Sequence, residues 1–448
     1  MIFPLPLNPF EESLWLEDSP AYPCHIAVRM GFRGRLQREA LAGAIATAIA
    51  RHPLLGCNIE RNAAGQATWV PARQPGPEIA WSALPDDGRW PSLPRIDACR
   101  DFPVRFWAAE GGDRSQLVVN VHHACADGLG VMQFLGDLLL AYAAAVGGPA
   151  AARPMRRVDP SLLARRGEYG LTAGKLLRLL PKVLWWGLLG AREFLMRKPT
   201  PLVPHVPVPR DAPLPENYPA VLVHEFSVAE TTAMRVAARQ RRVTVNDQLV
   251  SAWFLAMDGW RQSRGLGGDK RWLRLMVPMS LRGPEDREMP AANIVSTLYI
   301  DRRPRELVDP AVLLDGIHDE LALYKRHQLG VLFVLSLQLC RWLPGGLERT
   351  VRRKPSLGTA ILTNVSRPLD LVRLPREDGK LVAGNVVLET CDGFPPIRPG
   401  ICAALGVMGY AGRLRLGLHY DARVLDRDQD SDLLQRFVAA ASPPAAAG

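Results

Sequence analysis

A proline-rich stretch near the middle of the chain limits its possible folds more than any other feature. Residues 199–219 read PTPLVPHVPVPRDAPLPENYP, with eight prolines in 21 positions. Proline lacks a backbone N–H and fixes φ, so this composition favours an extended, polyproline-like segment over a compact element. The sequence therefore predicts a crossover at 199–219 that joins an N-terminal half, residues 1–198, to a C-terminal half, residues 220–448.

Hydrophobic periodicity alternates between helix and strand on both sides of this crossover. In the N-terminal half it predicts helices at 36–55 and 131–146 and strands at 67–70, 103–109 and 116–121. The C-terminal half has predicted helices at 228–242, 244–260 and within 308–340, and predicted strands at 220–227, 273–281, 294–301, 358–365, 381–388, 400–408 and 412–421. This rhythm is typical of an α/β (α+β) fold in which mixed sheets are backed by helices.

The composition is that of a globular protein with a moderate positive charge. Of 448 residues, 48% are hydrophobic and 22% are charged, and the formal net charge is +10. Such a charge suits an acidic partner: a phosphorylated cofactor, an acidic carrier protein or an anionic lipid surface. The sequence has no zinc-finger spacing, RNA-binding aromatic signature or Lys/Arg block, so we expect no nucleic-acid partner.

The cysteines and apolar runs bear on where the protein acts. The seven cysteines are scattered and never form a CxxC pair, which favours a reducing cytoplasm over a disulfide framework or a zinc site. We expect no signal peptide, and the apolar runs 183–191 and 329–340 are too short to span a membrane. Lys175, Arg178 and Lys182 share one face of a predicted helix, which either contacts a membrane surface or packs on the domain with its cations in solvent.

One apolar strand ends in an unusual polar pair. In 117-LVVNVHHACADGLGVMQFL-135, His122 and His123 are followed by Asp127 and Gly128, which form a predicted turn before the predicted helix. Adjacent residues of an extended chain point to opposite sides, so one histidine alone can face a given cleft. A histidine with a near-neutral pKa is a natural general base for an alcohol or amine. The aspartate can bind an arginine, and the glycine permits a tight turn.

Three other interpretations of this stretch remain open at the level of residues. The pair can be one packed and one surface histidine. It can belong to a metal site, although no third ligand lies nearby at a familiar spacing. Cys125 can be a thiolate nucleophile activated by His123, although residues two apart in a turn rarely align that way.

The full pattern H-H-x-x-x-D-G resembles the active-site motif of the CoA-dependent acyltransferase superfamily with the chloramphenicol acetyltransferase shape. The stretches 244-TVND-247, 277-VPMSLRG-283, 292-ANIVS-296, 361-ILTNVSRP-368 and the tail 404–426 resemble later blocks of its wax-ester synthase/diacylglycerol acyltransferase and alcohol acetyltransferase branches. Condensation domains of peptide synthetases share the motif. The plant BAHD closing motif DFGWG is absent. The resemblance runs from about residue 7 to about residue 438.

This resemblance implies two chloramphenicol acetyltransferase-like halves with an active-site tunnel between them. It implies that His123 is the general base, midway along the tunnel, with His122 as its supporting neighbour. Asp127 is expected to pair with Arg282 of the block 278-PMSLRG-283 rather than to contact substrate, and Gly128 to keep the loop tight.

The resemblance also points to groups that bind the negative charge on the thioester oxygen. Thr363, Asn364 and Ser366 lie in the block that approaches the histidine, so they are candidate oxyanion or substrate contacts, with capping or turn hydrogen bonding as the alternative role. The segment 363-TNVSRP-368 replaces the common family pattern S-N-V-P-G-P. Asn246 and Asp247 are expected to form a helix N-terminus.

The predicted activity is transfer of an acyl group from an acyl-CoA thioester to a hydroxyl or amine acceptor, with no permanently bound cofactor, metal or covalent enzyme intermediate. The Leu/Trp-rich stretches 176–195 and 329–340 indicate a hydrophobic acyl chain or acceptor. The first alternative is a free-standing condensation enzyme that uses the phosphopantetheine thioester of an acyl or peptidyl carrier protein. The second is a non-catalytic docking module.

Overall fold

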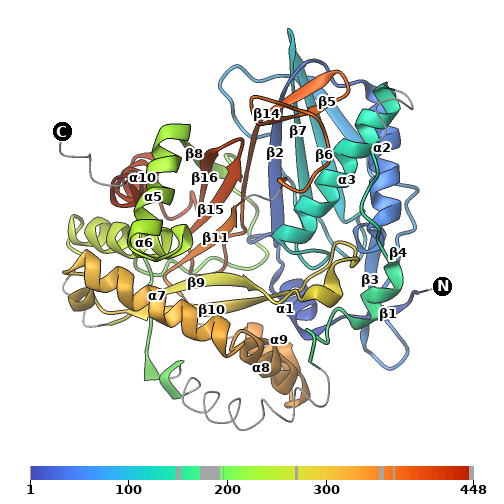
Figure 1. Cartoon of the computed structure of the whole chain (residues 1–448). Coiled ribbons are helices and arrows are strands. Elements are labelled where there is room, and N and C mark those ends of the chain that lie inside the picture. Colours follow the sequence, from blue (N-terminus) through green and yellow to red (C-terminus); the bar gives the residue numbers. More distant parts are fainter. Residues whose placement is uncertain are drawn as a thin grey trace.

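The chain forms two lobes, each built around a large sheet, with a third, small sheet beside the N-terminus (Figure 1). The computed structural model describes residues 2–147, 153–171, 192–194, 196–267, 271–352, 358–366 and 369–442. The predicted basic helix with Lys175, Arg178 and Lys182, and the run 183–191, lie outside the described residues.

The first lobe has a seven-stranded sheet in the order β12-β13-β14-β2-β7-β6-β5. Its strands are β2 (His25–Arg33), β5 (Ile79–Ala83), β6 (Val104–Gly111), β7 (Arg114–His122), β12 (Arg376–Glu377), β13 (Lys380–Ala383) and β14 (Val386–Phe394). Helices α2 (Arg38–Arg51) and α3 (Gly128–Gly147) pack against each other and cover one face of this sheet (Figure 1). The small sheet joins β1 (Leu5–Pro6), β4 (Ala67–Pro71) and β3 (Cys57–Arg61).

The second lobe has a six-stranded sheet in the order β10-β9-β11-β15-β16-β8. These strands are β8 (Ala220–Phe226), β9 (Leu273–Ser280), β10 (Val295–Arg302), β11 (Ala360–Ser366), β15 (Ala403–Tyr410) and β16 (Arg413–Tyr420). Helices α5 (Val228–Gln240), α6 (Val245–Gln262), α7 (Pro310–Arg326) and α10 (Arg427–Ala441) lie beside it (Figure 1). The buried Trp253, Trp260 and Phe437 fill the core between α6 and α10.

Three strands of the C-terminal half, β12, β13 and β14, belong to the sheet of the first lobe. Sequence patterns did not predict this placement. Strand β14 pairs antiparallel with β2, and the buried ion pair Arg29–Asp392, 2.9 Å, links the two strands. Gly406 and Gly417 of the second sheet allow β14 to approach that sheet closely. A Cβ would lie 2.7 Å from the carbonyl oxygen of Gly393 at position 406, and 2.4 Å from it at position 417. The division of the chain into two halves at 199–219 stays a prediction. Residues 376–394, which follow this crossover in sequence, complete the seven-stranded sheet of the first lobe.

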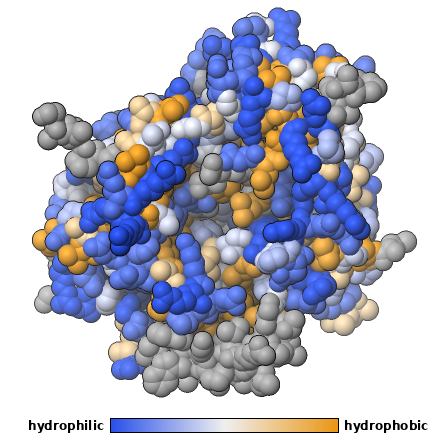
Figure 2. All heavy atoms as spheres, viewed as in Figure 1, coloured by the Kyte–Doolittle hydropathy of each residue, from blue (hydrophilic) through white to orange (hydrophobic). Residues whose placement is uncertain are grey.

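The proline-rich crossover has neither helix nor regular strand in 199–219, apart from a single bridge from Pro199 to Trp272. The predicted helical region 308–340 divides into α7 and α8 (Val331–Trp342), and α8 packs with α9 (Gly346–Val351) and α1 (Pro9–Glu17). The space-filling view shows hydrophobic atoms between the lobes within a largely hydrophilic surface (Figure 2).

Helix α3 combines a length and a composition that are also found in membrane-spanning helices. Its 20 residues pass that test by length and composition alone, although the sequence includes Asp137 and is not an uncharged run. Yet 72% of its apolar window is buried inside the protein. Because it is buried against the sheet and α2, α3 has the character of a core helix.

Candidate active site

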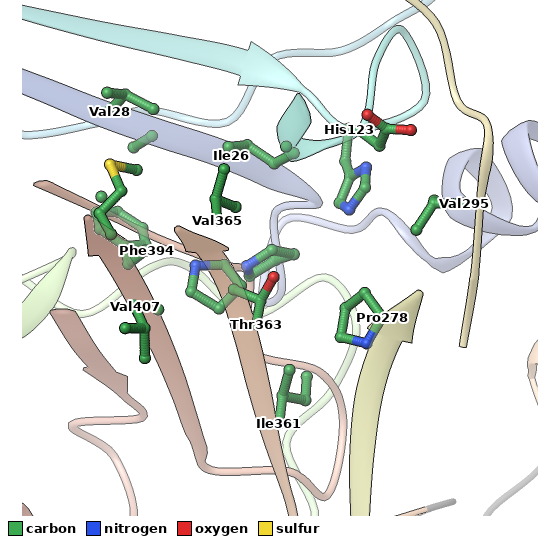
Figure 3. Close-up of a pocket in the computed structure, with 18 of the residues that line it drawn as sticks. Ile26, Val28, His123, Pro278, Val295, Ile361, Thr363, Val365, Phe394 and Val407 are labelled. Atoms are coloured by element: carbon green, nitrogen blue, oxygen red, sulfur yellow. The ribbon is translucent and has the colours of Figure 1, made fainter. Parts of the chain in front are cut away.

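A cavity that is partly open to solvent lies between the two lobes where a tunnel was predicted, and its space of about 880 Å³ includes open solvent. Strands β2 and β14 of the first sheet and β9, β11 and β15 of the second supply most of its wall (Figure 3). The wall is mainly apolar, with Phe10, Ile26, Val28, Phe394 and Val407 among its members. An apolar lining with a few polar groups suits a ligand that has an apolar part.

His123 lies at this cavity, in the turn between β7 and α3. Its backbone N–H donates to the carbonyl of Cys24 at 2.8 Å, and its partly exposed ring points into the cavity (Figure 3). Burial lowers the pKa of His123 to about 4. The positive charge of Arg398 adds to this shift, whereas the carbonyl of His123 itself and the Asp127 carboxylate oppose it. The imidazole is therefore neutral near pH 7, the protonation state that a general base needs.

His122 points the other way and belongs to a buried network. Its Nδ1 accepts a hydrogen bond from the N–H of Ala124 at 3.2 Å, and its Nε2 lies 3.9 Å from Oδ2 of Asp18. Burial alone would raise the pKa of Asp18, but interactions with His122, His25 and Arg95 lower it to about 2. The ring of His25 packs edge-on to that of His122, with 6.0 Å between centroids. His122 therefore stabilises the turn on the side away from the cavity. Side chains that alternate along an extended chain predict this orientation.

Asp127 and Arg282 are in contact, as the sequence predicted. The guanidinium donates from Nη1 to Oδ2 at 2.7 Å and from Nη2 to Oδ1 at 3.0 Å. The same carboxylate accepts from the N–H groups of Gly130, 2.8 Å, and Ile294, 2.9 Å. Arg282 also donates to the carbonyl of Ala292 at 3.1 Å. This bidentate pair ties the turn of the first lobe to β9 and the segment before β10.

Gly128 acts in the structure through the space around it rather than through the turn geometry that the sequence suggested. It does not adopt the left-handed backbone that glycine favours, so the turn does not depend on its conformational freedom. A Cβ at this position would instead lie 3.2 Å from Cγ2 of Val365. Gly128 therefore keeps space between α3 and β11 at the cavity wall.

The three candidate oxyanion residues of β11 are not equivalent. Thr363 lines the cavity opposite His123 (Figure 3). Asn364 is not among the residues that line the cavity, and its amide donates to Oδ1 of Asn246 at 3.2 Å, which favours the alternative, structural hydrogen-bonding role. Ser366 is the last residue of β11, and its side chain lies outside the described part of the structure. Thr363 remains the candidate of this block.

Sequence reasoning missed two residues that shape the site. Asn293 is fully buried, and its amide donates to the carbonyls of His123, 2.9 Å, and Ala124, 2.7 Å, which fixes the histidine turn from the second lobe. The block 292-ANIVS-296 had signalled this position without a role. Arg398 lies in the loop after β14 and lines the cavity, in a segment with no sequence motif. Asp247 acts structurally, because it closes a capping box with Thr244 at the start of α6.

The alternative chemistries find little support in the described residues. Within these ranges, no group of three His, Cys, Asp or Glu side chains is placed to hold a metal ion. Cys125 is fully buried, and burial raises the pKa of its thiol well above the usual value, so it is a poor candidate for a thiolate nucleophile.

Comparisons with known proteins agree with this geometry. No family model matches the chain. The first condensation domain of the calcium-dependent antibiotic synthetase, solved with a substrate analogue, superposes with a TM-score of 0.69 at 15% identity, covering 98% of this chain and 95% of that one. The fold is that of a condensation domain. The starter condensation domain of rhizomide synthetase, solved as a mutant with C8-CoA and Leu-SNAC, gives 0.65 at 15% identity over 98% and 95% of the two chains.

A curated relative carries a similar sequence. The isonitrile lipopeptide synthase of Mycobacterium tuberculosis is 29% identical over an alignment of 264 residues, which covers 54% of this chain and 10% of that protein. The chain thus spans about a tenth of the length of this relative. The resemblance and the two-lobed fold predicted from the sequence are confirmed.

Proposed function

We propose that this chain transfers an acyl group from a thioester to a hydroxyl or amine, with His123 as the general base. One observation carries the proposal: a neutral imidazole points into an apolar cavity between two lobes, on a turn held by the Asp127–Arg282 pair. The condensation-domain fold and the synthase relative support the same class of reaction.

The chemistry follows from the positions of the side chains. The acceptor oxygen or nitrogen attacks the thioester carbonyl carbon while His123 accepts its proton. The carbonyl electrons move to the oxygen, where the hydroxyl of Thr363 is the candidate donor. The oxyanion then collapses, the carbon–sulfur bond breaks, and the proton on His123 passes to the leaving thiolate. The products are an ester or amide and a free thiol.

An acyl-CoA is the proposed donor, and the thioester of a carrier protein is the second candidate. The apolar cavity and the net charge of +10 suit a hydrophobic acyl chain on a phosphorylated carrier. A structural neighbour was solved with C8-CoA, which supports the first donor. The relative is a much longer lipopeptide synthase, which supports the second.

Release of free thiol tests the proposal and separates the donors. The purified chain is given short, medium and long acyl-CoAs, or acylated carrier protein, with alcohol and amine acceptors, and product is identified by mass spectrometry. Acceptor-dependent thiol release from acyl-CoA supports the main proposal. Turnover with loaded carrier protein alone supports the condensation enzyme. No turnover with either donor, from folded protein, supports a docking module.

Peripheral membrane contact also remains a proposal, as does a cytoplasmic location. Leu339 and Trp342 of α8 and the following Leu343 are exposed, with Trp342 at 73%. The exposed Arg349 lies close to them in sequence and suits an anionic lipid surface. Sedimentation with anionic liposomes tests this contact, and protein that stays wholly in the supernatant would contradict it.

A further inference from the structure

Arg398 lies on the walls of two cavities in the described part of the chain. The first is the reaction cavity with His123, and the second, a small open pocket, lies against Tyr22, residues 203–206 and residues 400–402. Arg398 therefore stands at the junction of two spaces, one of which contains the general base.

A tight turn fixes the position of Arg398. Its N–H and carbonyl both bond to Ile401, at 3.4 Å and 2.9 Å, and Pro399 and Gly400 occupy the two central positions. Gly400 has φ of 78°, which this turn requires and which glycine adopts without strain. The backbone is therefore preorganised to hold the guanidinium at the cavity wall.

The hydrogen-bonding capacity of Arg398 is only partly used within the described residues. Its guanidinium makes one ion pair there, from Nη1 to Oε2 of Glu17 at 2.6 Å, and each side chain is 21% exposed. Burial raises the pKa of Glu17, which disfavours the negative charge of this partner. An arginine presents five N–H donors, so a contact through one of them leaves donors for a ligand.

The rest of the reaction cavity offers no second cation of this kind. Of the charged residues on its wall, Asp127 is bonded to Arg282, and His123 is neutral near pH 7. A hydrocarbon chain gains nothing from a guanidinium, the thioester is uncharged, and the phosphates of a CoA or phosphopantetheine donor are separated from that thioester by the length of the pantetheine arm. The group that Arg398 suits is an anion on the molecule whose nucleophile reaches His123.

We propose that Arg398 binds a carboxylate of the acyl acceptor, so that the acceptor is a small hydroxy or amino acid rather than a neutral alcohol or a carrier-bound aminoacyl group. The claim that the bound molecule is the acyl acceptor rests on the proposed function. The claim that Arg398 binds a carboxylate does not. The carboxylate takes the free N–H donors of Arg398 and competes with Glu17 for the guanidinium. An Arg–carboxylate pair in such a partly buried site is strong and directional.

Binding of a matched acid and amide tests the site without any turnover. Phenylacetate and phenylacetamide are titrated into the full chain by calorimetry or ligand-observed NMR. The wild type is expected to bind the acid about tenfold more tightly or better, because a hydrogen-bonded charge is lost in the amide. Arg398→Gln is expected to abolish this preference, and Arg398→Lys to keep part of it. The control Arg73→Gln, which alters a surface pair with Glu60, is expected to keep it fully.

A second variant guards against a folding defect in the first. Glu17→Gln removes the competing carboxylate and is expected to tighten phenylacetate binding, whereas weaker binding would overturn the proposal. Equal binding of acid and amide to the wild type, or an acid preference that survives in folded Arg398→Gln, would also overturn it.

Turnover then separates this inference from the proposed function. With an accepted acyl-CoA, kcat/KM for phenyllactate is expected to exceed that for phenyllactamide by about tenfold or more, and Arg398→Gln to equalise the two. Arg398-dependent acid binding without acyl transfer to any acceptor would end the proposed function and leave the carboxylate site standing. Acyl transfer with no preference for the acid would end the carboxylate site and leave the proposed function standing.

Discussion

The Asp127–Arg282 pair allows a quantitative test of how the two lobes hold the histidine turn. Arg282→Ala removes two charge-assisted hydrogen bonds from a carboxylate that is 4% exposed, whereas the N–H groups of Gly130 and Ile294 still bind it. Loss of one partner of a buried pair costs about 3–5 kcal/mol. Because two donors remain and Arg282 is 14% exposed, we expect the lower end, about 3 kcal/mol.

A double-mutant cycle measures the coupling energy between Asp127 and Arg282 separately from the effect of each single substitution. Unfolding in urea is followed by tryptophan fluorescence and circular dichroism for Asp127→Ala, Arg282→Ala and the double variant, and coincident transitions justify the analysis. We expect a coupling energy of about 2–3 kcal/mol. The exposed pair Arg73–Glu60 is the matched control, with an expected coupling below about 1 kcal/mol. A coupling at Asp127–Arg282 below about 0.5 kcal/mol would refute the reasoning.

Three further predictions concern the base, the strand crossing and the oxyanion donor. Because the pKa of His123 is about 4, kcat/KM is expected to stay flat from about pH 8 to 6 and to fall towards pH 4 as the base becomes protonated; an inflection near pH 6.5 would contradict this. Gly406→Ala, with its Cβ 2.7 Å from the Gly393 carbonyl, is expected to destabilise by about 1–3 kcal/mol in urea unfolding. Gly43→Ala, in open space on α2, is expected to stabilise by about 1 kcal/mol, and the opposite order would contradict the crossing geometry. Thr363→Val is expected to lower kcat about a hundredfold in a thiol-release assay, and an unchanged kcat would exclude its hydroxyl as the donor.

The sequence predicted the parts of the site that a local pattern encodes. His122 and His123 follow an apolar strand, so alternation alone required that they face opposite sides. The pairing of Asp127 with Arg282 came from the family resemblance and not from spacing, since 155 positions separate them in the chain. The two-lobed fold followed from the same resemblance together with the strand and helix rhythm.

The rest depends on contacts that no local pattern encodes. The single strand predicted at 381–388 is divided in the structure between β13 and the start of β14, and the pattern did not show that β14 pairs with β2, because an apolar strand fits several neighbours. Asn364 was nominated with Thr363, although adjacent residues of a strand face opposite sides, and the polar block did not show which face meets the cavity. Arg398 lies in a loop, where distance along the chain says little about distance in space.

Replacement of His123 tests the central claim most directly. With an accepted thioester and acceptor, His123→Ala is expected to lower kcat by about a hundredfold to ten-thousandfold, while its circular dichroism spectrum and unfolding midpoint stay close to those of the wild type. A folded His123→Ala variant that kept the full rate of acyl transfer would contradict the assignment of this residue as the general base.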